Sequence, residues 1–351
     1  MAIPMIKMAI IGSLPSRLKV AYYRMKGASI GKNVKIGLFS VILADEITIG
    51  DDTRIGALSF IRCRKLHLGN RVQIGSMVAV DTGEVKIGHD SSIMEQVVIG
   101  GMKTPRSRID IGARVKVFPY CFLNPTEPIV IENEVGVGGS NYLFTHGSWQ
   151  SVLDGYPIGF GPITIRKGVW LPWRVFILPN VEIGEYCTIG AGAIINKNIP
   201  PRSLAVGAPA KVISENGAYL KAVTREGKQD IVRNILAEFA EFLTYEGKPS
   251  TVHSDEHSVV ITVENTGSRP QVVRFALNAE DVENTARDAT AILSFDTIPD
   301  GVRAELGSRN MTWFDLESTE CTFGTSPLFH DIRNYFSRFG VRFAISGESD
   351  I

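Results

Sequence analysis

The fold is decided by residues 165–195, which read IRKGVWLPWRVFILPNVEIGEYCTIGAGAII. An aliphatic residue returns at every sixth position of this stretch: Ile165, Leu171, Ile177, Ile183, Ile189 and Ile195. Three such hexads form a triplet of 18 residues. Similar triplets begin upstream at Ile30, Ile49, Leu68, Ile87, Ile111 and Ile131, mostly 18 to 20 residues apart. A repeat of this length is typical of an architecture in which each unit packs on the next.

The period of the repeat predicts a prism of stacked triangular coils. Three short strands joined by three turns would form one coil, and the aliphatic residues of successive coils would stack into a continuous core. Eight coils spaced by the usual ~4.8 Å between strands give a prism about 38 Å long. The longer steps before Ile111 and Ile165 predict insertions. We therefore expect a mainly β fold, with a parallel β-helix over residues 30–213.

Composition narrows the class of protein. The chain has 351 residues, of which 44% are hydrophobic and 21% charged, which fits a globular protein and argues against disorder. Lys+Arg and Asp+Glu both number 37, so the overall charge does not favour a nucleic-acid partner. The four cysteines are far apart and form no CxxC pair, which predicts reduced thiols in a cytoplasmic protein. No apolar stretch reaches the length needed to cross a bilayer, and residues 1–12 lack a cleavage site for secretion.

The hexads break after Leu143, where the sequence continues Phe144-Thr145-His146-Gly147. About 15 residues, up to Pro162, interrupt the repeat before Ile163 resumes it. A loop held by a rigid scaffold commonly carries function. A neutral imidazole, with its ordinary pKa near 6.5, can take a proton from a hydroxyl group at cellular pH. His146 is therefore a candidate general base, and the alternative is a turn histidine bonded to a nearby carbonyl.

The hexads over residues 30–213 resemble the left-handed β-helix, or hexapeptide-repeat, acyltransferase superfamily. Residues 145–213 resemble its maltose, galactoside and polysaccharide O-acetyltransferase branch. The matching residues are Thr145-His146, Gly161-Pro162, Val169-Trp170, Ile183-Gly184, Gly190-Ala191-Gly192-Ala193, Lys197 and Val206-Gly207-Ala208-Pro209-Ala210-Lys211-Val212-Ile213. The resemblance implies a left-handed coil and His146 as general base. It also implies acetyl-CoA as co-substrate without a metal, direct transfer without a covalent enzyme intermediate, and a homotrimer with active sites between subunits.

The resemblance also implies residues that contact the two substrates. The coenzyme A arm would run along Ala191, Gly192 and Ala193, and Lys197 or, with stronger support, Lys211 would neutralise its phosphates. The expected acceptor-binding residues are Asn124, Trp170, Asp154 and Tyr156, the last two because they lie in the inserted loop. Each residue also has an alternative interpretation without a binding role. Residues 191–193 would simply form a regular hexad, and the lysines and the two loop residues would be solvated. Trp170 would be packed on the prism, and Asn124 would form a turn before a proline. Pro172 departs from the related motif and cannot donate an amide to an oxyanion.

The remaining residues form the two ends of the chain. Residues 1–29 predict a helical cap, in which Leu14, Leu18, Tyr22 and Met25 recur at helical spacing and basic residues form the polar face. The helix over residues 13–28 either covers the first coil or makes a peripheral contact with the inner, cytoplasmic face of a membrane. Residues 214–351 predict an accessory α+β domain whose helix spans residues 216–246. Its role in acceptor recognition, oligomer contacts or partner binding is open.

These patterns predict an acetyl-CoA-dependent transferase that O-acetylates a sugar hydroxyl of a surface polysaccharide or its precursor. N-acetylation of an amino sugar is the alternative within the same class. A γ-type carbonic anhydrase shares the β-helix but needs three zinc-binding histidines, and the prism holds only His67, His89 and His146, without that family's close histidine pair. A non-catalytic scaffold, with the work done by the C-terminal domain, is a third class.

Overall fold

The computed structural model describes residues 5–147, 149–254, 257–264, 269–285, 289–309, 311–324 and 326–349. The chain divides into two compact units, Met1–Leu220 and Lys221–Ser349. Among the described residues, no helix is both long enough and apolar enough to cross a membrane.

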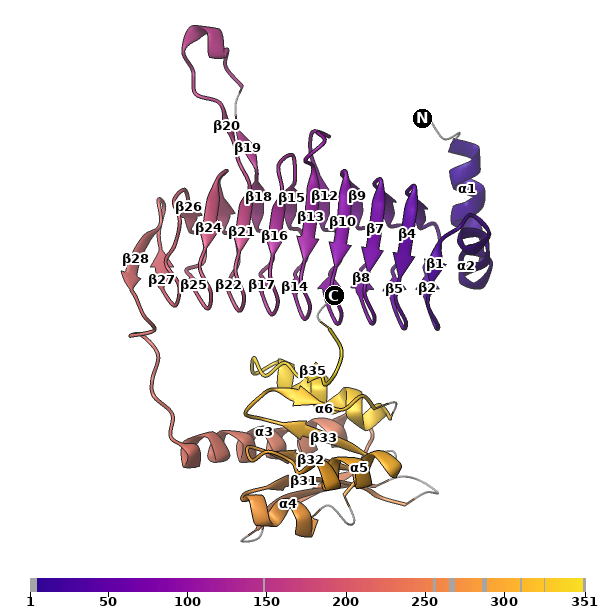
Figure 1. The fold of residues 1–351 in the computed structure, drawn as a ribbon, viewed down its shortest axis with the longest axis vertical. Coiled ribbons are helices and arrows are strands. Elements are labelled where there is room, and N and C mark those ends of the chain that lie inside the picture. Colours follow the sequence, from indigo (N-terminus) through magenta and orange to yellow (C-terminus); the bar gives the residue numbers. More distant parts are fainter. Residues whose placement is uncertain are drawn as a thin grey trace. The chain divides into compact units, whose positions relative to one another are not determined.

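The first unit is a prism of three parallel sheets (Figure 1). Sheet A contains β1 (Ser29–Ile30), β4 (Glu46–Ile49), β7 (Lys65–Leu68), β10 (Glu84–Ile87), β13 (Arg108–Ile111), β16 (Ile129–Ile131), β21 (Ile163–Ile165) and β24 (Val181–Ile183). Sheet B contains β2 (Lys35–Ile36), β5 (Arg54–Ile55), β8 (Gln73–Ile74), β11 (Ser92–Ile93), β14 (Lys116–Val117), β17 (Gly136–Val137), β22 (Trp170–Leu171), β25 (Thr188–Ile189), β27 (Leu204–Val206) and the antiparallel β28 (Lys211–Ser214). Sheet C contains β3 (Val41–Leu43), β6 (Phe60–Arg62), β9 (Ala79–Asp81), β12 (Val98–Gly100), β15 (Phe122–Asn124), β18 (Tyr142–Phe144), β23 (Phe176–Ile177) and β26 (Ile194–Ile195).

The chain visits sheets A, B and C in turn and winds as a left-handed β-helix, as expected. The residues that open the predicted triplets pair with one another along sheet A, from Ile30 with Ile49 to Ile165 with Ile183. All eight are buried, at 9% exposure or less. The hexad therefore predicted both the register and the core, because one aliphatic residue per strand must face inward.

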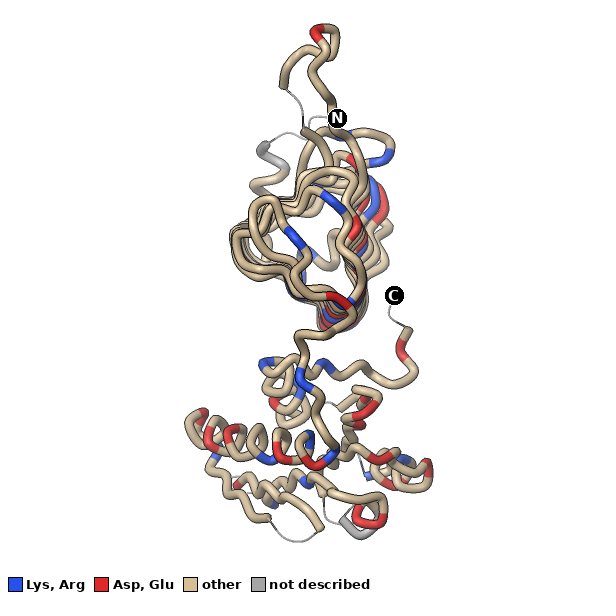
Figure 2. The backbone as a smooth tube through the Cα atoms, turned by 90° about the vertical axis from the view of Figure 1, so that its left-hand side faces the viewer, with Lys and Arg blue, Asp and Glu red and all other residues tan. Residues whose placement is uncertain are grey.

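Charged residues alternate along the edge between sheets A and B. One residue of each coil has a left-handed backbone there, including Arg71, Asp90, Arg114 and Glu134. Arg71 Nε lies 2.8 Å from Asp90 Oδ1, and Arg114 Nη2 lies 3.0 Å from Glu134 Oε1. Figure 2 shows basic and acidic residues stacked along the prism. Opposite charges one coil apart help to hold the register of the coils.

Two helices, α1 (Met5–Ser13) and α2 (Ser16–Met25), cover the first coil. The buried side chains of α2 are Lys19 and Tyr23. The Lys19 ammonium donates to the carbonyl oxygen of Gly37, and the Tyr23 hydroxyl accepts the N–H of Ile42 at 2.8 Å. Both contacts satisfy backbone groups at the open end of the β-helix, where no further coil can do so.

The helix predicted for the cap is present, and its apolar residues mostly face away from the first coil. Leu18 and Met25 are 54% and 79% exposed, and Tyr22 is only half-buried. Polar groups of the first coil need hydrogen-bond partners, so Lys19 and Tyr23 occupy the buried positions instead.

The second unit has one mixed sheet of seven strands in chain order. Its strands are β29 (Ser250–Ser254), β30 (Ser258–Val263), β31 (Gln271–Ala276), β32 (Ala291–Ser294), β33 (Thr312–Asp315), β34 (Glu320–Cys321) and β35 (Ala344–Ile345). Its helices are α3 (Arg225–Tyr245), α4 (Ala279–Thr285), α5 (Asp300–Ser308) and α6 (Pro327–Ser337). Side chains of α3 and α6 join one core cluster and those of α4 and α5 another. The helix expected over residues 216–246 begins only at Arg225, where Thr224 caps it.

Candidate active site

His146 lies at the base of an arm that leaves the prism after β18 (Figure 1). Strand β19 (His146–Gly147) pairs in antiparallel fashion with β20 (Gly159–Phe160), and the short helix η1 (Val152–Asp154) lies at the tip of the arm. The Gly161 N–H donates to the carbonyl oxygen of Thr145 at 3.0 Å and closes the base. The insertion predicted from the broken hexad is thus a two-stranded arm with the histidine at its foot.

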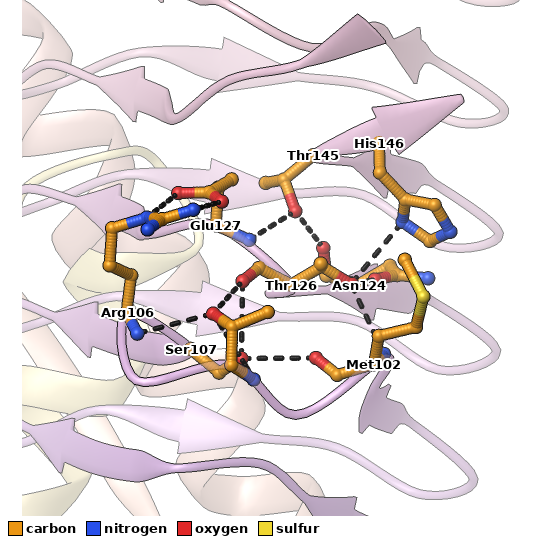
Figure 3. Close-up of polar contacts among 9 residues, drawn as sticks. Met102, Arg106, Ser107, Asn124, Thr126, Glu127, Thr145 and His146 are labelled. Atoms are coloured by element: carbon orange, nitrogen blue, oxygen red, sulfur yellow. Dashed lines mark hydrogen bonds and ion pairs between the residues drawn. The ribbon is translucent and has the colours of Figure 1, made fainter. Parts of the chain in front are cut away.

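The His146 ring is half-buried between two neighbours. On one side it stacks on the Phe160 ring, with centroids 5.8 Å apart and planes inclined by 23°. On the other side its Nδ1 lies 3.3 Å from the hydroxyl oxygen of Thr126, which belongs to the preceding coil (Figure 3). The ring is therefore held at one nitrogen and over one face.

Hydrogen bonding around Thr126 assigns the proton on the His146 ring. The Met102 N–H donates to Thr126 Oγ1 at 3.1 Å, and the Thr126 hydroxyl donates to Asn124 Oδ1 at 2.8 Å. A hydroxyl has one hydrogen, so its third contact, to His146 Nδ1, requires Nδ1 to be the donor. Nε2 then carries no proton and is the basic nitrogen of the neutral ring.

Thr145 fixes the backbone that leads to the histidine. Its fully buried hydroxyl donates to the carbonyl oxygen of Asn124 at 2.6 Å and accepts the N–H of Glu127 at 2.9 Å (Figure 3). Both partners lie one coil earlier in the chain. A threonine at this position therefore ties the start of the arm to the regular part of the prism.

An ion pair supports the loop that supplies the Met102 N–H. Arg106 binds both carboxylate oxygens of Glu127, at 2.8 and 2.5 Å, and its hydrogen bonds hold the pKa of that carboxyl below its ordinary value. Ser107 Oγ donates to the carbonyl oxygen of Thr126 at 3.1 Å. The loop that follows β12 is thereby fixed against the coil that carries Thr126.

Aromatic side chains cover the outer face of sheet C beside the arm. The Phe144 ring packs against Phe122 at 5.2 Å and against Phe176 at 5.3 Å between centroids, and Tyr142 stacks on Phe176 at 6.0 Å. Tyr142 remains 40% exposed. The sequence analysis did not predict this aromatic face. A signal was present, because Phe122, Tyr142 and Phe176 each directly precede a buried hexad position and Phe144 directly follows one.

The expected acceptor-binding residues do not gather around His146 within one chain. Asn124 is close, but it is 5% exposed and its side-chain oxygen accepts the Thr126 hydroxyl. Asp154 lies in η1 at the tip of the arm, with the exposed Tyr156 next to it in the loop, whereas His146 is at the base.

Trp170 belongs to sheet B, where its indole ring lies over Gly136, which has no side chain to block it. Phe118 packs at 6.4 Å from the Trp170 ring and at 6.3 Å from that of Trp173. Pro172 lies between β22 and β23, at the edge between sheets B and C. His146 follows sheet C on its other edge, so the missing amide of Pro172 is not next to it in this chain.

Ala191, Gly192 and Ala193, along which the coenzyme A arm is expected to run, lie between β25 and β26 at the edge between sheets B and C. Ala191 and Gly192 are exposed and Ala193 is buried, and Gly192 has a positive φ with open space where a Cβ would be. Lys197 and Lys211 are exposed. Sheet C therefore separates Ala191, Gly192 and Ala193 from His146 within one chain, whereas Lys197 follows β26 on the same edge as His146 and Lys211 belongs to β28 of sheet B.

Buried cysteines of the prism serve as small core residues. Cys121 is 1% exposed, its thiol donates to the carbonyl oxygen of Gly138 at 3.0 Å, and burial raises its pKa to about 11. Cys187 bonds the carbonyl oxygen of Pro200 in the same way. Neither thiol is a ready nucleophile. In the described ranges, no three His, Cys, Asp or Glu side chains are grouped as metal ligands would be.

Curated proteins match short parts of the chain. A Schizosaccharomyces pombe protein named "Putative acetyltransferase" is 56% identical over 88 residues, which cover 24% of this chain and 42% of that protein. The galactoside O-acetyltransferase of Escherichia coli is 50% identical over 54 residues, 15% of this chain and 27% of the enzyme. The chain thus spans less than half the length of the curated relatives it matches. No family model matches it.

Solved structures with a similar coil share little sequence with the chain. The polySia-specific acetyltransferase NeuO is 21% identical, with 54% of this chain and 80% of that chain covered and a TM-score of 0.39. The polysialic acid O-acetyltransferase OatWY is 18% identical, with 54% and 88% covered and a TM-score of 0.31. Likeness at this level says nothing about function. The triangular hexapeptide coil and the local matches of 50 to 56% identity confirm the resemblance to the hexapeptide-repeat acyltransferase superfamily.

Proposed function

We propose that the chain is an acetyltransferase that moves an acetyl group from acetyl-CoA to a sugar hydroxyl, with Nε2 of His146 as the general base. The observation that carries the proposal is the position of His146. It stands where the repeat opens into an arm, and its Nδ1 contacts the Thr126 hydroxyl, which leaves Nε2 as the unprotonated nitrogen of the neutral ring. The local identity to proteins named as acetyltransferases supports the same reaction class.

The reaction requires one proton transfer in each direction. Nε2 of His146 takes the proton of the acceptor hydroxyl as its oxygen attacks the thioester carbonyl. The carbon–sulfur bond then breaks, and the imidazolium returns the proton to the departing thiolate. Because Nδ1 donates to Thr126 throughout, the ring keeps its orientation as the charge on it changes.

Acetyl-CoA would lie along the edge that carries Ala191, Gly192 and Ala193. Small side chains there leave backbone groups open to a pantetheine arm, and Gly192 has open space at its Cβ position. Lys211 or Lys197 would neutralise the coenzyme phosphates, and Lys211 has the stronger support from the resemblance. Asn124 would act by holding Thr126 and not by binding the acceptor, since its side-chain oxygen is already used.

Assembly would bring the two edges of sheet C together. We propose a homotrimer in which the coenzyme edge of one subunit meets the His146 edge of the next, because sheet C separates them within one chain. The aromatic face of sheet C and the arm, whose Trp149 and Leu153 are 95% and 93% exposed, offer apolar surface for such contacts. Trp170, Asp154 and Tyr156 would reach an acceptor only across this interface.

The acceptor is proposed to be a hydroxyl of a surface polysaccharide or of its precursor. N-acetylation of an amino sugar uses the same base, so hydroxyl and amine acceptors should be compared in one thiol-release assay. Turnover with hydroxyl acceptors only is the expected result.

The proposal is tested with His146→Gln, which keeps the side chain polar and uncharged but removes the base. General-base catalysis typically contributes 10²- to 10⁴-fold, so we expect kcat to fall by at least about 100-fold with the oligomer intact. Gln150→Ala is a control on the same arm, at an exposed position to which the proposal assigns no role. Activity of His146→Gln within about tenfold of wild type would contradict the assignment. Failure of the wild-type chain to bind coenzyme A in calorimetry would favour the scaffold alternative.

A further inference from the structure

The N-terminal end of the prism has an unbalanced charge. Residues 1–44 contain seven basic residues and no Asp or Glu, although the whole chain has 37 of each kind. The basic residues are Lys7, Arg17, Lys19, Arg24, Lys26, Lys32 and Lys35. Residues 45–351 therefore carry 30 basic and 37 acidic side chains. The positive charge of this neutral protein is concentrated at one end.

Apolar side chains are exposed at the same end. Ile10 of α1 is 59% exposed, and Leu18 and Met25 of α2 are 54% and 79% exposed. The neighbouring turn exposes Phe39 at 54%, and the Phe39 N–H donates to the carbonyl oxygen of Gly12 at 2.7 Å, which places this turn against α1. Exposed basic and apolar residues thus lie together at this end of the prism, on α1, α2 and the adjoining turn, which we call the N-terminal cap surface.

Helix α2 separates its two faces cleanly. Lys19 and Tyr23 face the first coil and are buried, whereas Leu18, Ala21 and Met25 recur at helical spacing on the opposite, exposed face. Exposed Arg17 precedes this stripe and exposed Lys26 follows it. An apolar stripe with cations at its borders is the pattern of a helix that lies in the interface of a bilayer.

We propose that the N-terminal cap surface docks onto an anionic lipid bilayer. Leu18 and Met25 would enter the boundary between headgroups and acyl chains, and Arg17, Lys26 and Lys32 would contact anionic headgroups. The charge favours lipid over a second copy of the chain, because two copies that met through this surface would bring two positive surfaces together. The proposal goes beyond acetyl transfer and stands independently of it.

Arg24 must be left out of the test. Its guanidinium donates to the carbonyl oxygens of Ile30 and Gly31, both at 2.8 Å, and so holds the first strand. The double variant Arg17→Gln/Leu18→Gln instead removes one cation and one apolar side chain that is 54% exposed. Its matched control is Leu220→Gln/Lys221→Gln. This variant changes an adjacent pair of the same kind, whose leucine is 56% exposed, where the first unit ends and the second begins.

The experiment is co-sedimentation of the full chain with vesicles of phosphatidylcholine alone or with 30% phosphatidylglycerol. We expect binding to the anionic vesicles only, and weaker binding as salt is raised. One cation at an anionic surface contributes about fivefold in affinity, and one inserted leucine about tenfold, so Arg17→Gln/Leu18→Gln should bind on the order of 50-fold more weakly. The control variant should bind like wild type.

Three results would overturn the proposal: no binding to anionic vesicles, equal binding by both variants, or self-association of the wild-type chain that Arg17→Gln/Leu18→Gln abolishes without lipid. The last result would assign the surface to a second copy. Acetyl transfer to a soluble acceptor should be the same for both variants and wild type. A defect in docking is therefore distinguishable from a failure of the transferase assignment.

Discussion

Replacement of Thr126 by valine tests how the site holds its base. Valine keeps the volume of threonine but removes the hydroxyl that contacts Asn124 Oδ1 at 2.8 Å, the Met102 N–H at 3.1 Å and His146 Nδ1 at 3.3 Å. Thr126 is fully buried and Asn124 nearly so, so their lost partners are not replaced freely by water. Each buried group left without a partner costs about 1–3 kcal/mol, and we expect the variant to be about 2–4 kcal/mol less stable.

Turnover of this variant should fall more than its stability alone would suggest. One neutral hydrogen bond contributes about 1 kcal/mol, or roughly fivefold in rate if it orients the base only in the productive state. Without the hydroxyl the ring also gains access to the tautomer that carries its proton on Nε2, which cannot act as a base. We therefore expect kcat to fall by about tenfold or more at unchanged KM, while Thr126→Ser keeps most of the activity.

The assay combines thiol release with nitrogen NMR of the histidine rings. The chain has six histidines, and the signals that disappear in His146→Gln identify those of His146. In wild type and Thr126→Ser, Nδ1 should carry the proton of the neutral ring, and in Thr126→Val both tautomers should appear. A Thr126→Val enzyme with wild-type kcat, or a wild-type ring protonated at Nε2, would refute the reasoning.

Three further perturbations follow from contacts elsewhere in the prism. Gly136→Ala would place a Cβ 2.5 Å from the Trp170 ring, so we expect the free energy of unfolding to fall by about 1–3 kcal/mol and the tryptophan emission to shift to the red. The control is Gly301→Ala in α5, whose added Cβ meets nothing within 4 Å, so its melting temperature should be unchanged or higher. Burial lowers the pKa of Lys19, so just below the ordinary lysine value of about 10.4 the unfolded chain binds more protons than the folded one, and stability should rise with pH toward that value. Lys19→Met should abolish this slope in denaturant titrations at several pH values. The pKa of Glu127 is lowered by Arg106, so its contribution is present above the ordinary glutamate value near pH 4.3 and is lost as pH falls through its folded value; an acid titration that is the same for Glu127→Gln and wild type would contradict this.

The β-helix was predictable because each short segment of sequence determines its own part of the core. Each hexad contributes one inward aliphatic residue, so Ile30, Ile49 and Leu68 had to stack whatever the rest of the chain did. The face of α2 was not predictable in the same way. Its apolar spacing is equally consistent with burial and with a lipid surface, and only the hydrogen bonds of Lys19 and Tyr23 to the first coil decide between them.

The second unit was harder to predict because its strands are short and its sheet is mixed. The central strands β32 and β33 have only four residues each, and their parallel pairing depends on partners about 20 residues away. A four-residue apolar run is compatible with either a strand or part of a helix. Strands β30 and β31 are easier to recognise, because each has six residues and buried and less buried positions largely alternate along it.

The environment of His146 depends on the stacking of three coils. Met102, Thr126 and His146 each lie two residues beyond the end of a sheet C strand, namely β12, β15 and β18. The strands pair in parallel, so these three positions fall one above another at the same edge of the prism. A threonine 20 residues before the histidine therefore reaches its ring, whereas a shift of one residue would turn that side chain to the other face of the strand. The hexad that builds the core thus also aligns the groups that orient the proposed base, and this is why Thr126, unremarkable in the sequence, becomes the residue on which the tautomer of His146 depends.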